Sequence, residues 1–281
     1  MADYSKEMSN KLNIKLRKQI EYLPSFANTF FRGISANTSI KTRIAYAMDL
    51  KIFFEYLIEN HPKFTHYKDI KDICLSDLDY IKAVDLEDFS EYLSYYTKGH
   101  YKNDETKVSL SNSNRGKMRK LSTLRSFYKY YFKKELIKTN PTVLVDLPKN
   151  YEKPIVRLEP NEVANLLDEI ETGKNLTPSQ LKYHNKTKVR DLAIVTLLVG
   201  TGIRISECVG MNINDVDFDN DSFVVTRKGG NKTILYMPEE VRSALLRYLD
   251  EDREKIDVEE DALFLSLQHK RMTRSEERRV G

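Results

Sequence analysis

Helix-spaced apolar residues constrain the first half of this chain more than any other feature. Within residues 38–60, 85–96 and 115–136, apolar side chains recur at steps of three and four, which is the spacing of one face of an α-helix. We expect Asp85 to be the N-cap of the second of these helices. The pattern predicts amphipathic helices that share one core.

The third of these helices is strongly basic. Between residues 101 and 140, eleven Lys and Arg stand against three acids, a net charge of +8, whereas the rest of the chain sums to −4. The predicted apolar face comprises Leu121, Leu124, Tyr128 and Tyr131. A local positive field attracts polyanions, of which nucleic acid is the usual one. The residues to which we assign DNA contacts are Lys117, Arg119, Lys120 and Arg125. The alternative is a solvated helix face without a partner.

The second half of the chain changes in character. Asn140-Pro141 ends the helical region, because the residue before a proline is disfavoured in a helix. A helix is predicted to begin at Pro160, residues 173–188 are predicted to be irregular, and the apolar run LAIVTLLVG (residues 192–200) predicts a helix buried on most sides. Two β-rich runs then flank KGGNK (residues 228–232), which indicates a hairpin.

These patterns predict a mainly α fold with a small antiparallel β-sheet. The predicted divisions are an N-terminal arm (residues 1–21), a helical DNA-binding domain (22–139), a linker (140–155), a mixed second domain (156–273) and a tail (274–281).

The sharpest local motif is GTGIRISE (residues 200–207). Arg204 follows a glycine-broken turn at the start of a helix, so its surroundings hold it rigidly. Its planar guanidinium suits two oxygens of a phosphate. Glu207, three residues on, is placed to pair with Arg204 or with neighbouring backbone. The alternative is an arginine that closes a buried turn and has no ligand.

The second motif is the hairpin TRKGGNKT (residues 226–233). Arg227, Lys228 and Lys232 surround a double glycine, so the backbone could approach a phosphate closely, and we assign DNA contacts to Arg227 and Lys232. A lysine on a rigid hairpin is also suited to donate a proton. The alternative is a set of solvated turn residues.

Several classes of protein are disfavoured by the composition. Cys74 and Cys208 form no CxxC pair, which argues against a disulfide framework or a cysteine-rich zinc site. No metal-ligand spacing appears, no apolar run reaches the ~20 residues that span a bilayer, and the N-terminus lacks the apolar core of a signal peptide. We therefore expect a cytoplasmic protein without a metal, a cofactor or a membrane partner.

The order of basic helical domain, proline-bearing linker, apolar helix, GTGIRISE and basic glycine hairpin resembles the tyrosine recombinase (phage-type integrase) family. The resemblance extends from about residue 25 to residue 273 and is greatest to Xer-type members that resolve chromosome dimers. It implies a helical, SAM-like core-binding domain followed by part of an α+β catalytic domain. A mobile-element integrase of similar sequence is an alternative.

The resemblance also implies roles for the motif residues. Arg204 matches the first catalytic arginine, which binds non-bridging oxygens of the scissile phosphate. Lys228 matches the hairpin lysine that acts as general acid, and Glu207 matches an acidic position that supports the arginine. A tyrosine attacks the phosphate to give a 3′-phosphotyrosyl intermediate. Neither a metal nor ATP is required, and the partners are duplex DNA at a specific site and further copies of the protein in a tetrameric synapse.

The sequence departs from the family beyond the hairpin. No histidine has an arginine three residues later, the spacing in HKR (residues 269–271) is wrong, and the last of the 17 tyrosines is Tyr248. We therefore assign no nucleophile, and we expect this chain to bind DNA without forming a covalent adduct. RSEERRVG (residues 274–281) matches a translated sequencing adapter, so we expect a non-native tail on a truncated catalytic domain. The alternatives are a non-catalytic DNA-binding protein and a helical interaction protein whose basic helix is only surface.

Overall fold

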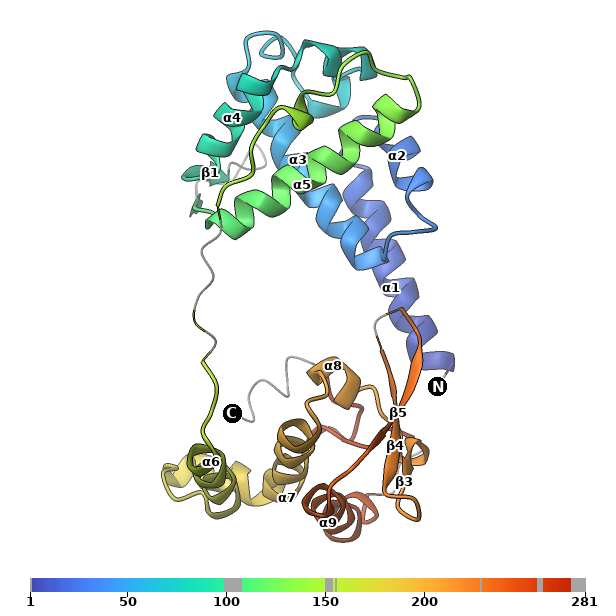
Figure 1. The fold of residues 1–281 in the computed structure, drawn as a ribbon, viewed down its shortest axis with the longest axis vertical. Helices are drawn as coiled ribbons and strands as arrows, with labels where there is room; N and C mark the ends of the chain where they lie inside the picture. Colours follow the sequence, from blue (N-terminus) through green and yellow to red (C-terminus); the bar gives the residue numbers. More distant parts are fainter. Residues whose placement is uncertain are drawn as a thin grey trace. The chain divides into compact units, whose positions relative to one another are not determined.

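The computed structural model of the chain describes residues 2–98, 108–149, 154, 156–227, 229–256 and 260–273. The chain divides into two compact units, Ala2–Lys153 and Pro154–Gly281, and Figure 1 shows the fold of each. The division falls inside the linker that the sequence predicts at residues 140–155. The predicted tail, residues 274–281, lies outside the described residues.

The first unit is mainly helical. Its α-helices are α1 (Ala2–Ile20), α2 (Ala27–Gly33), α3 (Ile40–Asn60), α4 (Ala83–Tyr92) and α5 (Asn114–Lys133). Its 3-10 helices are η1 (Ile70–Asp72), η2 (Leu75–Tyr80) and η3 (Pro141–Val143). Between α4 and α5, β1 (Tyr96–Lys98) pairs antiparallel with β2 (Val108–Leu110).

Aromatic side chains fill the centre of this unit. Phe54 of α3 and Phe127 of α5 are fully buried, with ring centroids 6.0 Å apart at an interplanar angle of 76°. The whole predicted apolar face of α5 is buried, and Tyr131 donates its hydroxyl hydrogen to the backbone oxygen of Phe26 at 2.7 Å. Because this face of α5 is packed inward, the opposite face is left at the surface.

Two local predictions in this unit differ from the structure. Asp85 is not the N-cap but the third residue of α4, where its carboxylate accepts a hydrogen bond from the backbone N–H of Lys82 at 2.7 Å. The acid still satisfies an N–H group that the helix itself leaves unpaired. Residues 2–20, most of the predicted arm, form α1, which packs against α3 within the helical unit.

The second unit combines helices with a three-stranded sheet. Its α-helices are α6 (Pro160–Thr172), α7 (Pro178–Thr201), α8 (Ile205–Cys208) and α9 (Glu239–Tyr248), followed by a π-helical turn η5 (Leu249–Arg253). After the 3-10 helix η4 (Ile213–Asp215), the strands β3 (Val216–Asp217), β4 (Ser222–Thr226) and β5 (Lys232–Tyr236) follow in antiparallel order β3-β4-β5. Phe223 and Val225 of β4 point into a core shared with α7 and α9. The predicted fold class, mainly α with a small antiparallel sheet, is confirmed.

Helix α7 corrects two predictions. It begins at Pro178, so most of the polar segment predicted to be irregular is helical. Thr177 and Gln180 form a capping box, in which the Gln180 side chain accepts the Thr177 N–H at 2.9 Å and the Thr177 hydroxyl accepts the Gln180 N–H at 3.4 Å. The apolar run at its C-terminal end is buried on one face only, at Ala193, Ile194 and Leu197. No helix in the described part of the chain has the length and apolar character needed to cross a membrane.

Candidate active site

The GTGIRISE turn is set by a left-handed glycine. Gly202 closes α7 with φ of 64°, a conformation that side-chain-bearing residues rarely adopt, and its N–H donates to the backbone oxygen of Leu198 at 2.9 Å. The chain then reverses, and Arg204 becomes the N-cap of α8 in an extended conformation. The turn therefore delivers the Arg204 side chain to the surface at the start of a new helix.

Glu207 lies buried between two arginines. Its Oε1 accepts a hydrogen bond from Arg204 Nη1 at 3.0 Å, and its Oε2 accepts from Arg204 N at 2.9 Å and from Arg227 Nη1 at 2.9 Å. The Glu207 side chain is 3% exposed, whereas those of Arg204 and Arg227 are 68% and 31% exposed. The arrangement is a two-arginine cluster of net positive charge, oriented by one buried carboxylate, with its cationic side open to solvent.

The charge state of Glu207 follows from these contacts. Burial on its own would raise the pKa of this carboxyl, but the Arg204 N–H, the Arg204 guanidinium and the positive charge of Arg227 together hold the pKa below its usual value of 4.5. Glu207 is therefore ionised at neutral pH and keeps both guanidinium groups fixed.

Replacement of Glu207 by Gln is expected to destabilise the second unit by about 1–2 kcal/mol at neutral pH, because hydrogen bonds to charged partners are weakened. The pKa of Glu207 is lower in the folded chain, so the stabilisation by its charge is complete above pH 4.5 and is lost as pH falls through the lowered folded value. The difference between wild type and Glu207→Gln should therefore shrink below pH 4.5 in urea titrations followed by circular dichroism. A difference that stays constant with pH would contradict this account.

The β4–β5 hairpin carries Arg227 and the glycine pair. The N–H of Arg227 donates to the backbone oxygen of Asn231 at 2.7 Å, and the N–H of Gly230 donates to the backbone oxygen of Arg227 at 3.0 Å. Gly229 and Gly230 have φ of 96° and 89°, which explains why the tip requires glycine. Lys228, the predicted general acid, lies outside the described residues. Lys232, a predicted DNA contact, is exposed at the start of β5 opposite Thr226.

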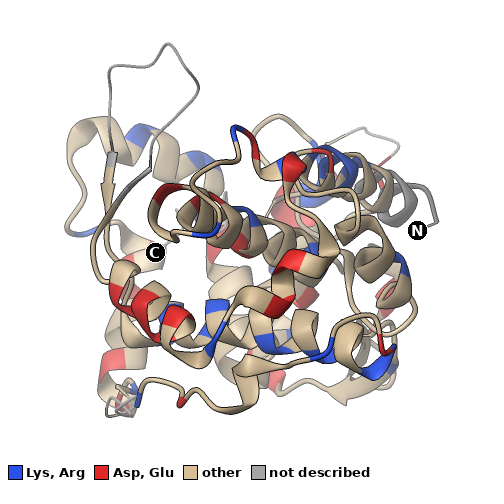
Figure 2. Ribbon diagram, turned by 90° about the horizontal axis from the view of Figure 1, so that it is seen from above, with Lys and Arg blue, Asp and Glu red and all other residues tan. Residues whose placement is uncertain are grey.

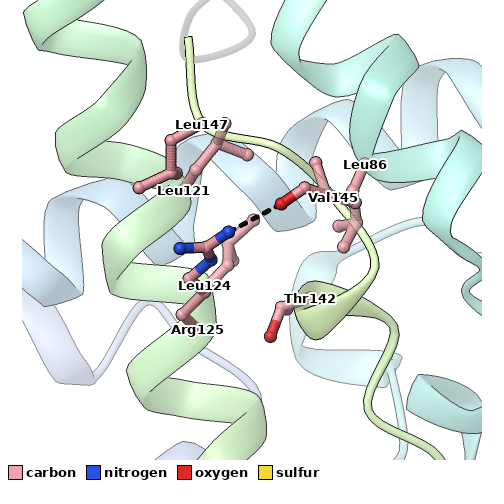
Figure 3. Close-up of a pocket in the computed structure, with 7 residues that line it drawn as sticks. All are labelled: Leu86, Leu121, Leu124, Arg125, Thr142, Val145 and Leu147. Atoms are coloured by element: carbon pink, nitrogen blue, oxygen red, sulfur yellow. Dashed lines mark hydrogen bonds between the residues drawn. The ribbon is translucent and has the colours of Figure 1, made fainter. Parts of the chain in front are cut away.

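The predicted DNA contacts on α5 have different surroundings. The Lys120 side chain is buried and donates to Asn112 Oδ1 at 2.7 Å, while Lys117 is half-buried and donates to Ser94 Oγ at 2.6 Å. Arg125 points toward the segment that follows η3 (Figure 3), where its Nη2 donates to the backbone oxygen of Val145 at 2.6 Å. Arg125 and Val145 line a small pocket, whose other lining residues are Leu86, Leu121, Leu124, Thr142 and Leu147. Of the predicted α5 contacts, Arg119 is the most exposed.

Lys and Arg are interspersed with Asp and Glu among the helices (Figure 2), but the outer face of α5 carries only one sign of charge. Steps of three and four residues place Arg115, Arg119, Ser122, Ser126, Lys129 and Lys133 on that face, which we call the α5 row. All six are exposed or half-buried, and α5 contains no acidic residue. Sequence reasoning did not single out Arg115, Lys129 or Lys133, although the same spacing that identified the apolar face defines this row.

Tyr248 and Arg271 serve the core of the second unit. The Tyr248 hydroxyl accepts the N–H of Leu265 at 3.3 Å, and burial raises its pKa to about 12. The last tyrosine of the sequence is thus buried in the core of the second unit. Arg271 donates to the backbone oxygens of Val209 and Met211 at 3.2 and 3.0 Å, and so ties its own segment to the chain that follows α8.

Comparison of the sequence with known proteins finds the same family that the two motifs resemble. Residues 156–280 match the Phage integrase family. Tyrosine recombinase XerC of Caldanaerobacter subterraneus subsp. tengcongensis is 32% identical over an alignment of 254 residues, and the match covers 89% of this chain. By these matches the chain is similar to the tyrosine recombinase family, and within it to Xer-type members. It spans 64% of the length of that XerC.

Solved structures share the fold. The Tn1549 transposon integrase in complex with circular intermediate DNA aligns with a TM-score of 0.56 and 19% identity, covering 89% of this chain and 74% of that one. A lambda integrase tetramer bound to a Holliday junction aligns with a TM-score of 0.58 and 15% identity, covering 91% of this chain and 62% of that one. At these identities the likeness establishes the architecture of a helical domain followed by a mixed α and β domain.

Proposed function

We propose that the full-length protein is a site-specific DNA recombinase that cuts and rejoins DNA through a phosphotyrosyl intermediate. The observation that carries this proposal is the two-arginine cluster on Glu207. A buried carboxylate fixes two guanidinium groups and leaves the side chain of Arg204 mostly open to solvent. A fixed, exposed fork is suited to the non-bridging oxygens of a phosphate, and it needs no reorganisation as negative charge builds up there.

The chemistry assigns one step to each group. The oxygen of a tyrosine attacks the scissile phosphorus and forms a new P–O bond, while the bond from phosphorus to the 5′ oxygen breaks. Arg204 stabilises the negative charge on the phosphate oxygens, and Lys228 gives a proton to the departing 5′ oxygen. Glu207 holds Arg204 and, through Arg227, the base of the hairpin next to Lys228. This description rests on the family resemblance for the tyrosine and for Lys228.

DNA contact is proposed for the helical unit and for the hairpin. The α5 row presents cations at steps of three and four residues along one side of α5, and Arg227 and Lys232 extend the basic character to the second unit. The solved neighbours are a transposon integrase with circular intermediate DNA and a lambda integrase tetramer on a Holliday junction. By analogy, we propose duplex DNA at a specific site as the partner and a tetrameric synapse as the assembly. The Xer-like sequence favours chromosome dimer resolution, and hence chromosome segregation at cell division in the cytoplasm.

Binding of the 281-residue chain to duplex DNA is expected to weaken steeply with salt, because each phosphate contact releases a counterion. Replacing Arg115, Lys129 and Lys133 together by Gln should reduce the slope of log affinity against log salt by roughly 2–3. The matched control replaces the exposed Lys63, Lys68 and Lys71 by Gln, which removes the same charge away from α5. Native-gel retardation over a salt series measures this slope for wild type and for the two triple variants. Equal slopes for the two triple variants would contradict binding along the α5 row.

Covalent capture tests the cleavage step. The protein first selects its own site from a pool of short random duplexes, and the selected duplex is then made with a nick beside the cleavage position. Cleavage releases a short fragment that cannot rejoin, so the protein stays attached to the DNA. A band that survives denaturing gels is expected from the full-length protein. Retardation on native gels without such a band would instead favour a non-catalytic DNA-binding protein.

A further inference from the structure

A buried carboxylate in the helical unit accepts hydrogen bonds from an exposed arginine and a buried threonine. Asp49 of α3 is 2% exposed, and its Oδ2 accepts a hydrogen bond from Arg119 Nη1 at 2.5 Å and from the Thr123 hydroxyl at 2.9 Å. Its Oδ1 is buried without a hydrogen-bond partner among the described residues. Asp49 thus joins α3 to α5 at a position where its helix otherwise packs apolar residues such as Leu50 and Phe53.

This contact is a poor way to stabilise two packed helices. A buried carboxylate loses its hydration, and burial raises the pKa of Asp49. An apolar side chain of similar size at such a position is often as stabilising or more so. The specific result of the Asp49 contact is therefore geometric, because it fixes where the Arg119 guanidinium lies.

Arg119 stands at the surface within the α5 row. Its side chain is 50% exposed, and apart from Asp49 its guanidinium has no hydrogen-bond partner among the described residues. The neighbouring cations are less exposed than Arg119, and their ammonium groups donate to neutral side chains, Lys117 to Ser94 and Lys120 to Asn112. Within the α5 row, the guanidinium of Arg119 is therefore held in one orientation by Asp49, while the rest of the guanidinium remains open to solvent.

A fixed fork serves contacts that need two hydrogen bonds at once, either to two oxygens of a phosphate, as proposed for Arg204, or to the edge of a base, whereas general attraction to phosphates tolerates a mobile ammonium group. Because Arg119 lies in an α-helix, an element that the major groove admits, its fork can reach the edge of a base. Two adjacent acceptors of this kind are the O6 and N7 of guanine in the major groove. We propose that Asp49 and Thr123 are positioning residues that orient Arg119 to read a guanine in the target site. This inference rests on the proposed DNA-binding function.

Selection from random duplexes tests the inference. The wild-type chain and Asp49→Asn, Thr123→Val and Arg119→Lys variants each select from the same pool of short random duplexes, and the selected sequences are compared position by position. Wild type should show a guanine preference that Asp49→Asn and Arg119→Lys both lose by roughly tenfold or more, with the other positions unchanged. Thr123→Val should lose part of it. Lys129→Gln, which removes a cation from the same row, should weaken binding to all sequences equally.

Two further variants separate positioning from folding. Asp49→Leu replaces the carboxylate by an apolar side chain, so it should keep or raise the thermal midpoint while losing the same guanine preference. In an Arg119→Lys background, Asp49→Asn should change the preference no further, because Asp49 acts through Arg119. If Asp49→Asn and Asp49→Leu keep the wild-type preference, or weaken all sequences uniformly, the inference is wrong. If the wild-type chain selects no sequence at all, site-specific DNA binding itself fails, and this inference fails with it.

Discussion

Arg204→Ala in the full-length protein is expected to reduce covalent capture on nicked DNA by at least 10²- to 10³-fold, which removes the denaturing-gel band, while retardation on native gels is retained. Loss of a preorganised donor to the charge that develops at the reacting phosphate costs about this much in rate. Binding survives because the α5 row lies in the other unit and does not depend on Arg204. Arg204→Lys keeps the charge but loses the fork, so it should lie between Ala and wild type.

The structure indicates that this loss is chemical and not a failure to fold. Arg204 is 68% exposed, and exposed ion pairs contribute only about 0–1 kcal/mol. In the Ala variant Glu207 still accepts hydrogen bonds from the backbone N–H at position 204 and from Arg227. The urea transition of Arg204→Ala should therefore stay within about 1 kcal/mol of wild type. Undiminished capture by Arg204→Ala would leave the arginine only a structural role at the end of α7.

Local spacing was enough to predict much of the fold. The apolar period of α5 identifies Leu121, Leu124, Tyr128 and Tyr131, and all four are buried. The double glycine identifies the β4–β5 turn, where both glycines have positive φ. The helical spacing and the turn both depend on residues that are close together in the chain, so they can be recognised from the sequence alone.

Contacts between distant residues limited the site prediction. Lys120 and Arg125 count as cations of a basic helix, but each meets an acceptor outside α5, namely Asn112 and the Val145 backbone. The pairing of Arg204 with Glu207 follows from a spacing of three residues. Arg227 and Glu207 are 20 residues apart in the sequence, so their pairing depends on how the hairpin packs against α8. In the same way, Asp49 meets Arg119 across 70 residues. A single sequence records the charges but does not indicate which partner each one meets.

Capping and burial account for the errors around α7. The polar segment predicted to be irregular, residues 173–188, lies mostly within α7, because Thr177 and Gln180 satisfy the first N–H groups and proline is compatible with the first turn. Its apolar end looks like a fully buried helix, but Val199 remains 46% exposed. The number of faces of a helix that are covered depends on which elements pack against it, and periodicity alone does not contain that information.

Arg271→Met is expected to destabilise the second unit by about 2–4 kcal/mol, because several acceptors around the buried guanidinium lose a charged donor. The Arg271 side chain is only 7% exposed. Besides the two backbone oxygens after α8, it donates to Asn212 Oδ1 at 2.6 Å and to Glu260 Oε1 at 3.2 Å. Met fills a similar volume but leaves these acceptors without their donor. The control is Lys270→Gln, an exposed neighbour that should change stability by at most about 0.5 kcal/mol.

Hydrogen exchange measured by mass spectrometry suits a chain of two units, because the helical unit acts as an internal reference. Peptides that cover α8 and the residues after it should exchange much faster in Arg271→Met, while peptides from α3 and α5 keep wild-type rates. Because α8 carries Glu207, the same loosening should lower covalent capture by the full-length protein. Unchanged protection around Met211 would mean that the backbone after α8 is held by other contacts and that Arg271 contributes little to the geometry of Arg204.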